Sequence, residues 1–394
     1  MAMDLGVQHR TPAGTQHQEP VEVEGEDHLH AGGLGWKAIT TFIFSAASII
    51  LALFVIVALF TSPKTPKEPI APCSSVSDNG LMMCVDGSPS GLEYNFYEKS
   101  CPDAEHIIRS RVQTLYEQKS SVAPALIRLV FHDCFIGGCD ASVLLDGTVG
   151  IKSEKDVIPN LTLKGFDAID SIKERLEEAC PATVSCADIV VLAAREALFL
   201  VGAPFYPLPT GRRDSTSSYA DMALTEIPSP NADLLNFLPK FADRGFDARD
   251  TVALLGAHNV GVIHCSFLQQ RLYNFTQTAV GGSDPSINTE FFAELITRCP
   301  KLDSPPEEAT LEMKSSDSES FSNHYYDTLS QGRGILHSDQ ELMSLDDTAT
   351  WVEAFRHDIS RFHRNFAQAM IKLSNFNVTT SPHGNIRVHC SRVD

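Results

Sequence analysis

The segment ALIRLVFHDCFIGGCDASVLLD, residues 125–146, joins an apolar helix with reactive side chains to a loop that is rich in oxygen donors. Arg128 and His132 are four residues apart, so on a helix both project from one face into the same pocket. Phe131 borders that face. Asp133 turns about 100° away from His132, toward the loop. The segment therefore predicts an acid–base site beside a second site at the helix end.

The loop of this segment predicts a calcium site. The oxygens that can bind the ion, from side chains and from carbonyls at alternate positions, belong to Asp133, Ile136, Gly138, Asp140 and Ser142. Oxygen ligands in this number suit Ca²⁺. Cys134 and Cys139 bracket the turn, and a short disulfide between them would fix the ligands before the ion arrives. An Asp-rich loop without these cysteines would be only a solvated turn.

This segment resembles the distal-haem segment of the secreted class III plant peroxidases. Further segments resemble that family in the same order: VSCADIVVLAAR (184–195), PTGRRDS (209–215), ALLGAHNVG (253–261), LHSDQEL (336–342) and IRVHC (386–390). The resemblance covers about residues 93–390, and the order and spacing of its motifs argue strongly against coincidence. It implies an all-α, two-lobed haem peroxidase fold, with haem between distal and proximal helices.

The spacing of apolar residues also favours an all-α domain. Strand-like alternation is scarce after residue 93. Helical spacing extends over residues 103–118, 123–134, 166–179, 187–201, 232–244 and 351–373. An all-α domain of about 300 residues can bury a large prosthetic group between two lobes.

Composition divides the 394 residues into four parts. We expect a disordered acidic tail (1–37), a transmembrane signal anchor (38–60), a linker (61–92) and the peroxidase domain (93–394). Residues 38–60 are uncharged and long enough to span a bilayer of about 30 Å. A cleaved, unusually long signal peptide, which would give a secreted form, is the alternative. The net charge of −19, without a basic stripe, disfavours nucleic acid as a partner.

All ten cysteines follow the apolar span. Disulfides need an oxidising compartment, so we expect the catalytic domain to be luminal or extracellular, although the charges that flank the span weakly favour the opposite orientation. The resemblance implies four disulfides: Cys101–Cys180, Cys134–Cys139, Cys186–Cys390 and Cys265–Cys299. Cys73 and Cys84 remain and predict a fifth bridge near the membrane. Glycosylation sequons on the same side begin at Asn160, Asn274 and Asn377.

The resemblance assigns the reactive groups. His258 is the expected axial ligand of haem iron, and Asp339 accepts its other ring proton, which makes the imidazole more basic. Our hypothesis is that His132 takes a proton from hydrogen peroxide and returns it to the leaving oxygen. Arg128 stabilises the charge that develops there. Asn160 orients His132 through its other ring nitrogen and, because a buried amide cannot carry a glycan, is expected to be unmodified despite its sequon.

Other roles rest on the resemblance alone. Phe131 belongs to the expected distal catalytic pocket, and Glu154 supports the distal calcium without binding it directly. Pro228, in IPSP, resembles the family's contact for phenolic and other aromatic donors. Asp188 and Arg212 resemble a structural ion pair.

The sequence departs from the family at the second, proximal calcium site. Asn259 stands where a hydroxyl residue follows the axial histidine, Ser322 replaces an aspartate, and Lys314 falls near another aspartate position. These changes remove most of the charge that a divalent cation requires, although Asp317 and Asn259 can still offer oxygens. We expect this ion to be absent or weakly bound. Tyr206 replaces a usual tryptophan, a change of packing.

Two functions remain open. The first is a haem b and calcium peroxidase that reduces hydrogen peroxide with one-electron oxidation of phenolic donors, tethered to a membrane by its N-terminal helix. The second is a membrane-anchored homologue with weak or no activity that acts as a binding or scaffold protein. The retained reactive groups favour the first.

Overall fold

The computed structural model describes residues 75–76, 82–83, 91–275, 282–301, 310–312 and 321–393. The chain separates into two compact units, residues 1–69 and 70–394, and the described residues all belong to the second. The predicted tail, membrane span and most of the linker lie outside the described residues, as do Cys73, Cys84, Lys314 and Asp317. In the part of the chain that is described, no helix has the length and apolar character needed to cross a membrane.

The described residues are predominantly helical, as the resemblance implies. Their α-helices are α2 Ala104–Gln118, α3 Val122–Gly137, α4 Phe166–Ala179, α5 Cys186–Leu200, α6 Ala220–Glu226, α7 Leu234–Asp243, α8 Ala248–Leu255, α9 Gln269–Tyr273, α10 Thr289–Arg298, α11 His324–Ser330, α12 His337–Gln340, α13 Asp346–His357 and α14 Ile359–Ser374. Short 3₁₀ helices are η1 Ser142–Leu144, η2 Glu154–Asp156, η3 Ile158–Asn160, η4 Gly256–Asn259, η5 Cys265–Leu268 and η6 Glu341–Met343. Strands are β1 Ser75–Val76, β2 Met82–Met83, β3 Val262–His264 and β4 Thr310–Glu312.

Five of the predicted helices correspond to α2, α3, α4, α5 and α7, with small differences at their ends. The sixth prediction, one helix over 351–373, is wrong because α13 ends at His357 and α14 begins at Ile359. Between them Asp358 is extended, with φ −138° and ψ 92°, and its carboxylate accepts a hydrogen bond from Arg361 N at 2.9 Å. Asp358 therefore starts a new helix as its N-cap.

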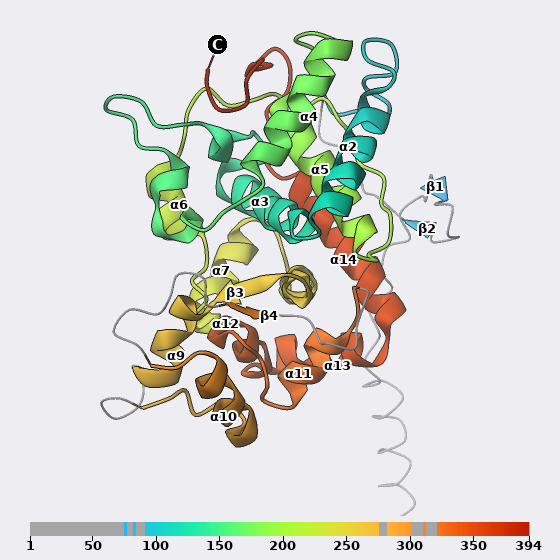
Figure 1. The fold of residues 1–394 in the computed structure, drawn as a ribbon. Helices are drawn as coiled ribbons and strands as arrows, with labels where there is room; N and C mark the ends of the chain where they lie inside the picture. The colour runs from blue at the N-terminus through green and yellow to red at the C-terminus, as the bar shows by residue number, and fades with distance from the viewer. Residues whose placement is uncertain are drawn as a thin grey trace, which may run out of the picture. The chain divides into compact units, whose positions relative to one another are not determined.

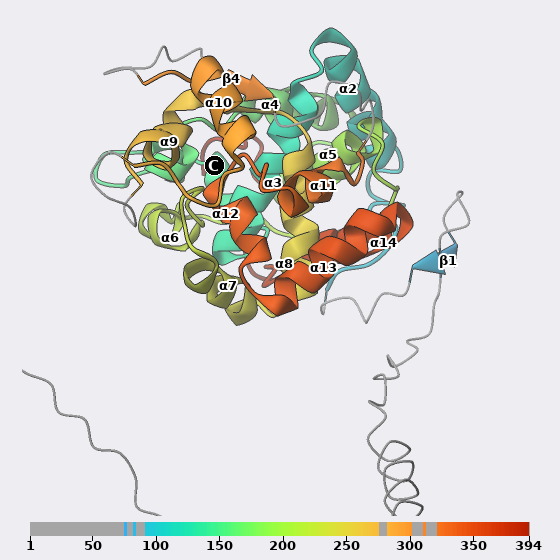
Figure 2. The same ribbon diagram turned by 90° about the horizontal axis from the view of Figure 1, so that it is seen from below.

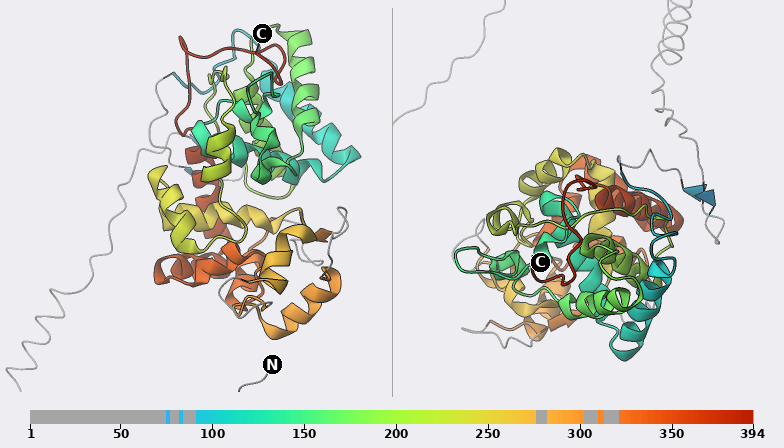
Figure 3. Two further views of the ribbon diagram at one scale, coloured as in Figure 1. Left: turned by 90° about the vertical axis from the view of Figure 1, so that its left-hand side faces the viewer. Right: turned by 90° about the horizontal axis from the view of Figure 1, so that it is seen from above.

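The core is built around α5, whose residues from Cys186 to Leu198 are all buried. A helix that is apolar on nearly all sides is stable only when neighbours surround it, and α2, α3 and α4 pack against it here. Figure 1 shows these helices together with α6 in the upper part of the domain, and α7 and α9 to α13 in the lower part. The side view in Figure 3 shows the same two groups.

The C-terminal helix α14 connects the two groups. It packs against α8 and α13 below and also contacts α3, and Figure 2 shows it lying beside α13 and α8. Phe362, Phe366 and Met370 place its apolar face in the core. The short antiparallel pair β3–β4, with Ile263 opposite Leu311, covers part of a smaller cluster around α9 and α10.

The four disulfides inferred from the family are all present: Cys101–Cys180, Cys134–Cys139, Cys186–Cys390 and Cys265–Cys299. The expected structural ion pair is also formed, with Arg212 Nη1 2.7 Å from Asp188 Oδ1 and both side chains fully buried. Tyr97 donates its hydroxyl to the other carboxylate oxygen at 2.6 Å. Because both charges are paired and hydrogen-bonded, burial does not leave either of them uncompensated.

Candidate active site

The imidazole of His132 is held in one orientation by Asn160. Asn160 donates its amide Nδ2 to Glu154 O at 2.8 Å, so its Oδ1 faces His132 Nδ1 as an acceptor at 2.6 Å. His132 must then carry its proton on Nδ1, so Nε2 is unprotonated and presents a lone pair that can act as a base. Burial, followed by the charge of Arg128, lowers the pKa of His132 to about 3. The imidazole is therefore neutral near pH 7.

Arg128 lies one helical turn before His132 on α3. Its Nε donates to His132 Nε2 at 3.2 Å, and its other nitrogens donate to Pro159 O at 2.9 Å and Thr162 Oγ1 at 3.0 Å. Burial lowers the pKa of Arg128 to about 10, which still leaves it charged at neutral pH. The segment around η3 therefore positions both Arg128 and His132, and a fixed positive charge stands directly beside the base.

Phe131 lies beside His132, with ring centroids 6.1 Å apart, and stacks on Phe135 at 4.7 Å. Phe135 also packs against Phe241 of α7. This aromatic group gives the face of α3 that carries the reactive side chains a rigid apolar border.

His258, in η4, has the partner that the sequence predicts. Its Nδ1 is 2.8 Å from Asp339 Oδ1, and this carboxylate oxygen also accepts the Tyr325 hydroxyl at 2.9 Å. Burial by itself would lower the pKa of His258, but Asp339 outweighs it and raises the pKa. The imidazole is 40 % exposed although Asp339 is buried, so its Nε2 side is open. A donor of this kind fits an iron porphyrin.

The two histidines come from distant parts of the chain and lie within electrostatic reach of each other. The charge of His258 is one of the causes that lower the pKa of His132, and the charge of Arg128 acts on His258. Gly256 lets η4 pack closely against α14, since a Cβ at this position would lie 2.6 Å from Cε2 of Phe362. The fold therefore brings an open, carboxylate-backed imidazole near a neutral imidazole and a guanidinium.

The predicted calcium loop gathers several buried oxygens. Asp133 accepts Ala141 N at 3.0 Å, and Asp140 accepts Ser142 N at 3.0 Å. Ser142 Oγ and Glu154 Oε2 are buried and have no hydrogen-bond partner among the described residues. Oxygens without partners are expected where a cation supplies the missing contact.

The electrostatics of this loop also indicate a cation site. Burial raises the pKa of Asp133, and Asp140 and Glu154 raise it further. Burial also raises the pKa of Asp140 and brings that of Glu154 to about 7. Three buried carboxylates that repel one another fit a divalent cation with oxygen ligands.

Backbone contacts shape the same loop. α3 continues to Gly137, so the carbonyl of Ile136 belongs to its last turn, where carbonyls lack helical partners. Gly138 has φ +112°, and a Cβ there would lie 2.8 Å from the carbonyl carbon of Asn377. Only glycine fits this conformation and this close approach.

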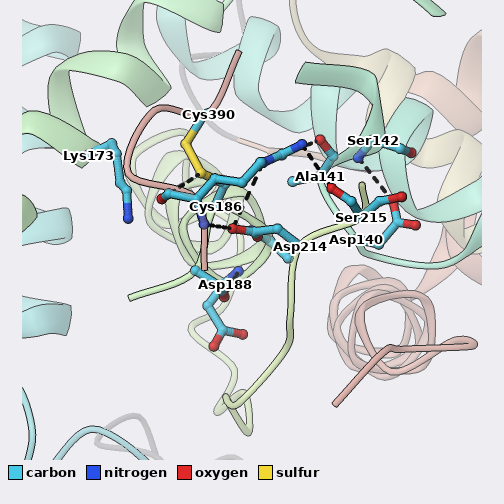
Figure 4. Close-up of polar contacts among 12 residues, drawn as sticks. Asp140, Ala141, Ser142, Lys173, Cys186, Asp188, Asp214, Ser215 and Cys390 are labelled. Atoms are coloured by element: carbon cyan, nitrogen blue, oxygen red, sulfur yellow. Dashed lines mark hydrogen bonds and ion pairs between the residues drawn. A yellow bond between two sulfur atoms is a disulfide. The ribbon is translucent and has the colours of Figure 1, made fainter. Parts of the chain in front are cut away.

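Three residues to which the sequence assigned no role, Asp214, Ser215 and Arg387, fasten this loop to the C-terminal segment. Arg387 donates Nη2 to Ala141 O at 2.7 Å, and its backbone N donates to Asp214 Oδ2 at 2.9 Å. Ser215 N donates to Asp140 O at 2.7 Å. Figure 4 shows Asp214 and Ser215 between the calcium loop and the Cys186–Cys390 disulfide. All three lie within family motifs, Asp214 and Ser215 in PTGRRDS and Arg387 in IRVHC, which is the signal that could have indicated them.

Comparison with known proteins identifies the domain. A family model described as peroxidase matches residues 108–358. Putative Peroxidase 48 of Arabidopsis thaliana is 45 % identical over 354 residues, which cover 81 % of this chain and 87 % of the relative. The chain belongs to the plant class III peroxidase family. Peroxidase 10 of the same plant is 41 % identical, covering 77 % of this chain and 87 % of its own length. Peroxidase 3, also of that plant, is 42 % identical, and the match covers 76 % of this chain and 91 % of the relative.

The family has a peroxidase activity that uses hydrogen peroxide and a reducing substrate, and its members generally bind haem and calcium. In this peroxidase Asn259, at the expected proximal cation position, donates its amide to Ser322 O at 2.7 Å. Tyr206 is buried, and its hydroxyl has no partner among the described residues. Pro228 is half-buried in the loop between α6 and α7. The neighbouring Pro230 in that loop accepts Ser338 N at 3.1 Å through its carbonyl.

Proposed function

We propose that this peroxidase reduces hydrogen peroxide to water and oxidises two phenolic molecules per turnover, each by one electron and one proton. The observation that carries the proposal is the His132–Asn160–Arg128 arrangement, in which burial and hydrogen bonding keep Nε2 unprotonated beside a fixed charge. A neutral imidazole next to a guanidinium is suited to moving one proton between the two oxygens of a peroxide.

His132 accepts a proton at Nε2 from hydrogen peroxide and returns it to the leaving oxygen, which departs as water. Arg128 stabilises the negative charge on that oxygen as the O–O bond breaks. His258 would hold haem through Nε2, and Asp339 would increase the basicity of this ligand. When bound, haem supplies the two electrons for the reduction and regains them from two donors.

The alanine variant of His132 tests this assignment. In haem-loaded full-length protein, His132→Ala is expected to lower kcat/KM for hydrogen peroxide in a guaiacol assay by a factor of about 10² to 10⁴. His106→Ala, an exposed histidine on α2, is the matched control. Haem binding without turnover in the unaltered protein would instead support the binding or scaffold function, and an active His132→Ala variant would refute the role of the imidazole.

We assign the calcium to the distal loop, with ligands from Asp133, Ile136, Gly138, Asp140 and Ser142, and Glu154 supporting the site. Support comes from the buried oxygens without hydrogen-bond partners and from the raised pKa values of the carboxylates. At the second position the amide of Asn259 is turned toward Ser322 O, which supports weak or no binding there. Calcium analysis of purified protein is expected to give one tightly held ion, and two would refute this assignment.

We place the catalytic domain in the secretory pathway, on the luminal or extracellular side of a membrane crossed by residues 38–60. Four disulfides in the described residues support an oxidising compartment. Asn274 and Asn377 are exposed, and the amide of Asn377 donates one hydrogen bond, to Gly137 O at 2.7 Å, whereas Asn160 is 2 % exposed and bonded through both amide atoms. Protease protection in microsomes, with a glycan shift at Asn274 or Asn377, is the expected result, and a soluble, digested domain would refute it.

A further inference from the structure

A second cluster of potential metal ligands lies outside the catalytic pocket and the calcium loop. His337 begins α12, Glu341 lies one helical turn later, and Asp233 precedes α7. One ligand atom from each lies within 4.8 Å of the other two. His337 Nε2 is 2.9 Å from Asp233 Oδ1 and 4.0 Å from Glu341 Oε1.

The ring of His337 is held from behind by a buried carboxylate. Its Nδ1 is 2.8 Å from Asp284 Oδ2, and Asp284 is also bonded by Arg271 Nε at 2.8 Å and Ser286 Oγ at 2.7 Å. Nδ1 therefore faces a carboxylate that two other donors already hold in place, and Nε2 is directed toward Asp233.

This is the arrangement in which proteins commonly present a histidine to a metal, with a carboxylate accepting the proton of the other ring nitrogen. The side chain of His337 is only 4 % exposed, so its position is rigid. Asp233 and Glu341 are 41 % and 22 % exposed, so an ion can reach the site from solvent. The site thus combines a preset imidazole with two accessible carboxylates.

We propose that Asp233, His337 and Glu341 bind one divalent transition-metal cation, with water as a fourth ligand. One imidazole and two carboxylates favour an ion of the Zn²⁺ type over Ca²⁺, which prefers oxygen ligands alone. Ligand atoms around tetrahedral zinc lie about 3.3 Å apart, and the two distances from Nε2, 2.9 and 4.0 Å, bracket this value. A proton that Nε2 shares with Asp233 passes to solvent when the metal bond forms.

Such an ion would join two segments that flank the active site. Asp233 ends the α6–α7 loop that contains Pro228, and His337 is two residues before Asp339. The bond from Ser338 N to Pro230 O and that from Leu234 N to Glu341 Oε2 at 3.1 Å already connect these segments. A metal bound to both would stabilise them against local opening, because it binds only the folded arrangement.

Titration calorimetry with Zn²⁺ on the full chain, saturated with calcium, tests the proposal. We expect Asp233→Asn and His337→Gln each to lose one equivalent of zinc. Asp284→Asn, which keeps all three ligands, is expected to weaken that equivalent by a factor of about 10 to 100. His106→Gln, at an exposed position on α2, is the matched control and should bind as the unaltered protein does.

Binding by other histidines is common to all variants and cancels in the comparison. Circular dichroism establishes which variants are folded, and Asp233→Asn provides a second reading if His337→Gln is unstable, since Asp233 is partly exposed. Unchanged zinc stoichiometry and affinity in either folded variant would overturn the proposal. Loss of one zinc equivalent in both Asp233→Asn and His337→Gln, with His106→Gln unaffected, would support the proposal independently of peroxidase activity.

Discussion

Replacing Glu154 by glutamine is expected to change stability in opposite directions with and without calcium. The side chain is buried, and in the calcium-free protein burial raises its pKa from 4.5 to about 7. When the pKa of a carboxylate is higher in the folded than in the unfolded state, the fold loses stability as the pH rises between these two pKa values, here from 4.5 to about 7. The full penalty above that range corresponds to about 3 kcal/mol.

Without calcium, Glu154→Gln should therefore unfold at a higher temperature than the unaltered protein at pH 8, and the gain should vanish at pH 4. With calcium the order should reverse, because the variant lacks a negative charge that attracts the cation. Thermal unfolding at the two pH values, in EGTA or in calcium, measures both effects. Glu174→Gln, at an exposed position on α4, is the control. A Glu154→Gln effect that is independent of both calcium and pH would refute the reasoning.

Three further predictions concern the catalytic ligand and the packing. Asp339→Asn should remove the charge that raises the pKa of His258 and make reduction of the iron easier, which a higher haem reduction potential would reveal. Gly256→Ala should destabilise the fold by about 1–3 kcal/mol, because its Cβ would meet Phe362; a melting temperature equal to that of the unaltered protein would contradict this. Asp358→Ala should cost about 1 kcal/mol, measured by urea unfolding, because α14 loses its N-cap.

Local patterns predicted much of the fold and of the candidate site. Arg128 and His132 were placed on one helix face by their spacing alone, and the structure shows them in contact. The disulfides followed only from the family resemblance, since spacing along the chain does not determine which cysteines pair. The break at Asp358 was missed because the apolar spacing continues through it, although an Asp before a helical run is a recognised start signal.

Contacts between residues that are distant in the sequence cannot be predicted from local patterns. The IRVHC motif marks Arg387, but it does not indicate that the guanidinium binds the carbonyl of Ala141, 246 residues earlier. The LHSDQEL motif indicates His337 only as a neighbour of Asp339, and the bonds of His337 to Asp233 and Asp284 arise because three separate segments fold against one another. Helical periodicity reports which face of an element is buried, but not which distant side chain meets it.

The contact between Arg387 and Ala141 has a consequence for the order of assembly. The calcium loop is fastened by a residue that lies 246 positions later in the chain. During synthesis the loop therefore stays without this contact until the later segment has emerged and folded back onto it. A nascent chain that stops short of Arg387 would thus hold an unfinished ion site, although all the loop's own residues are already present.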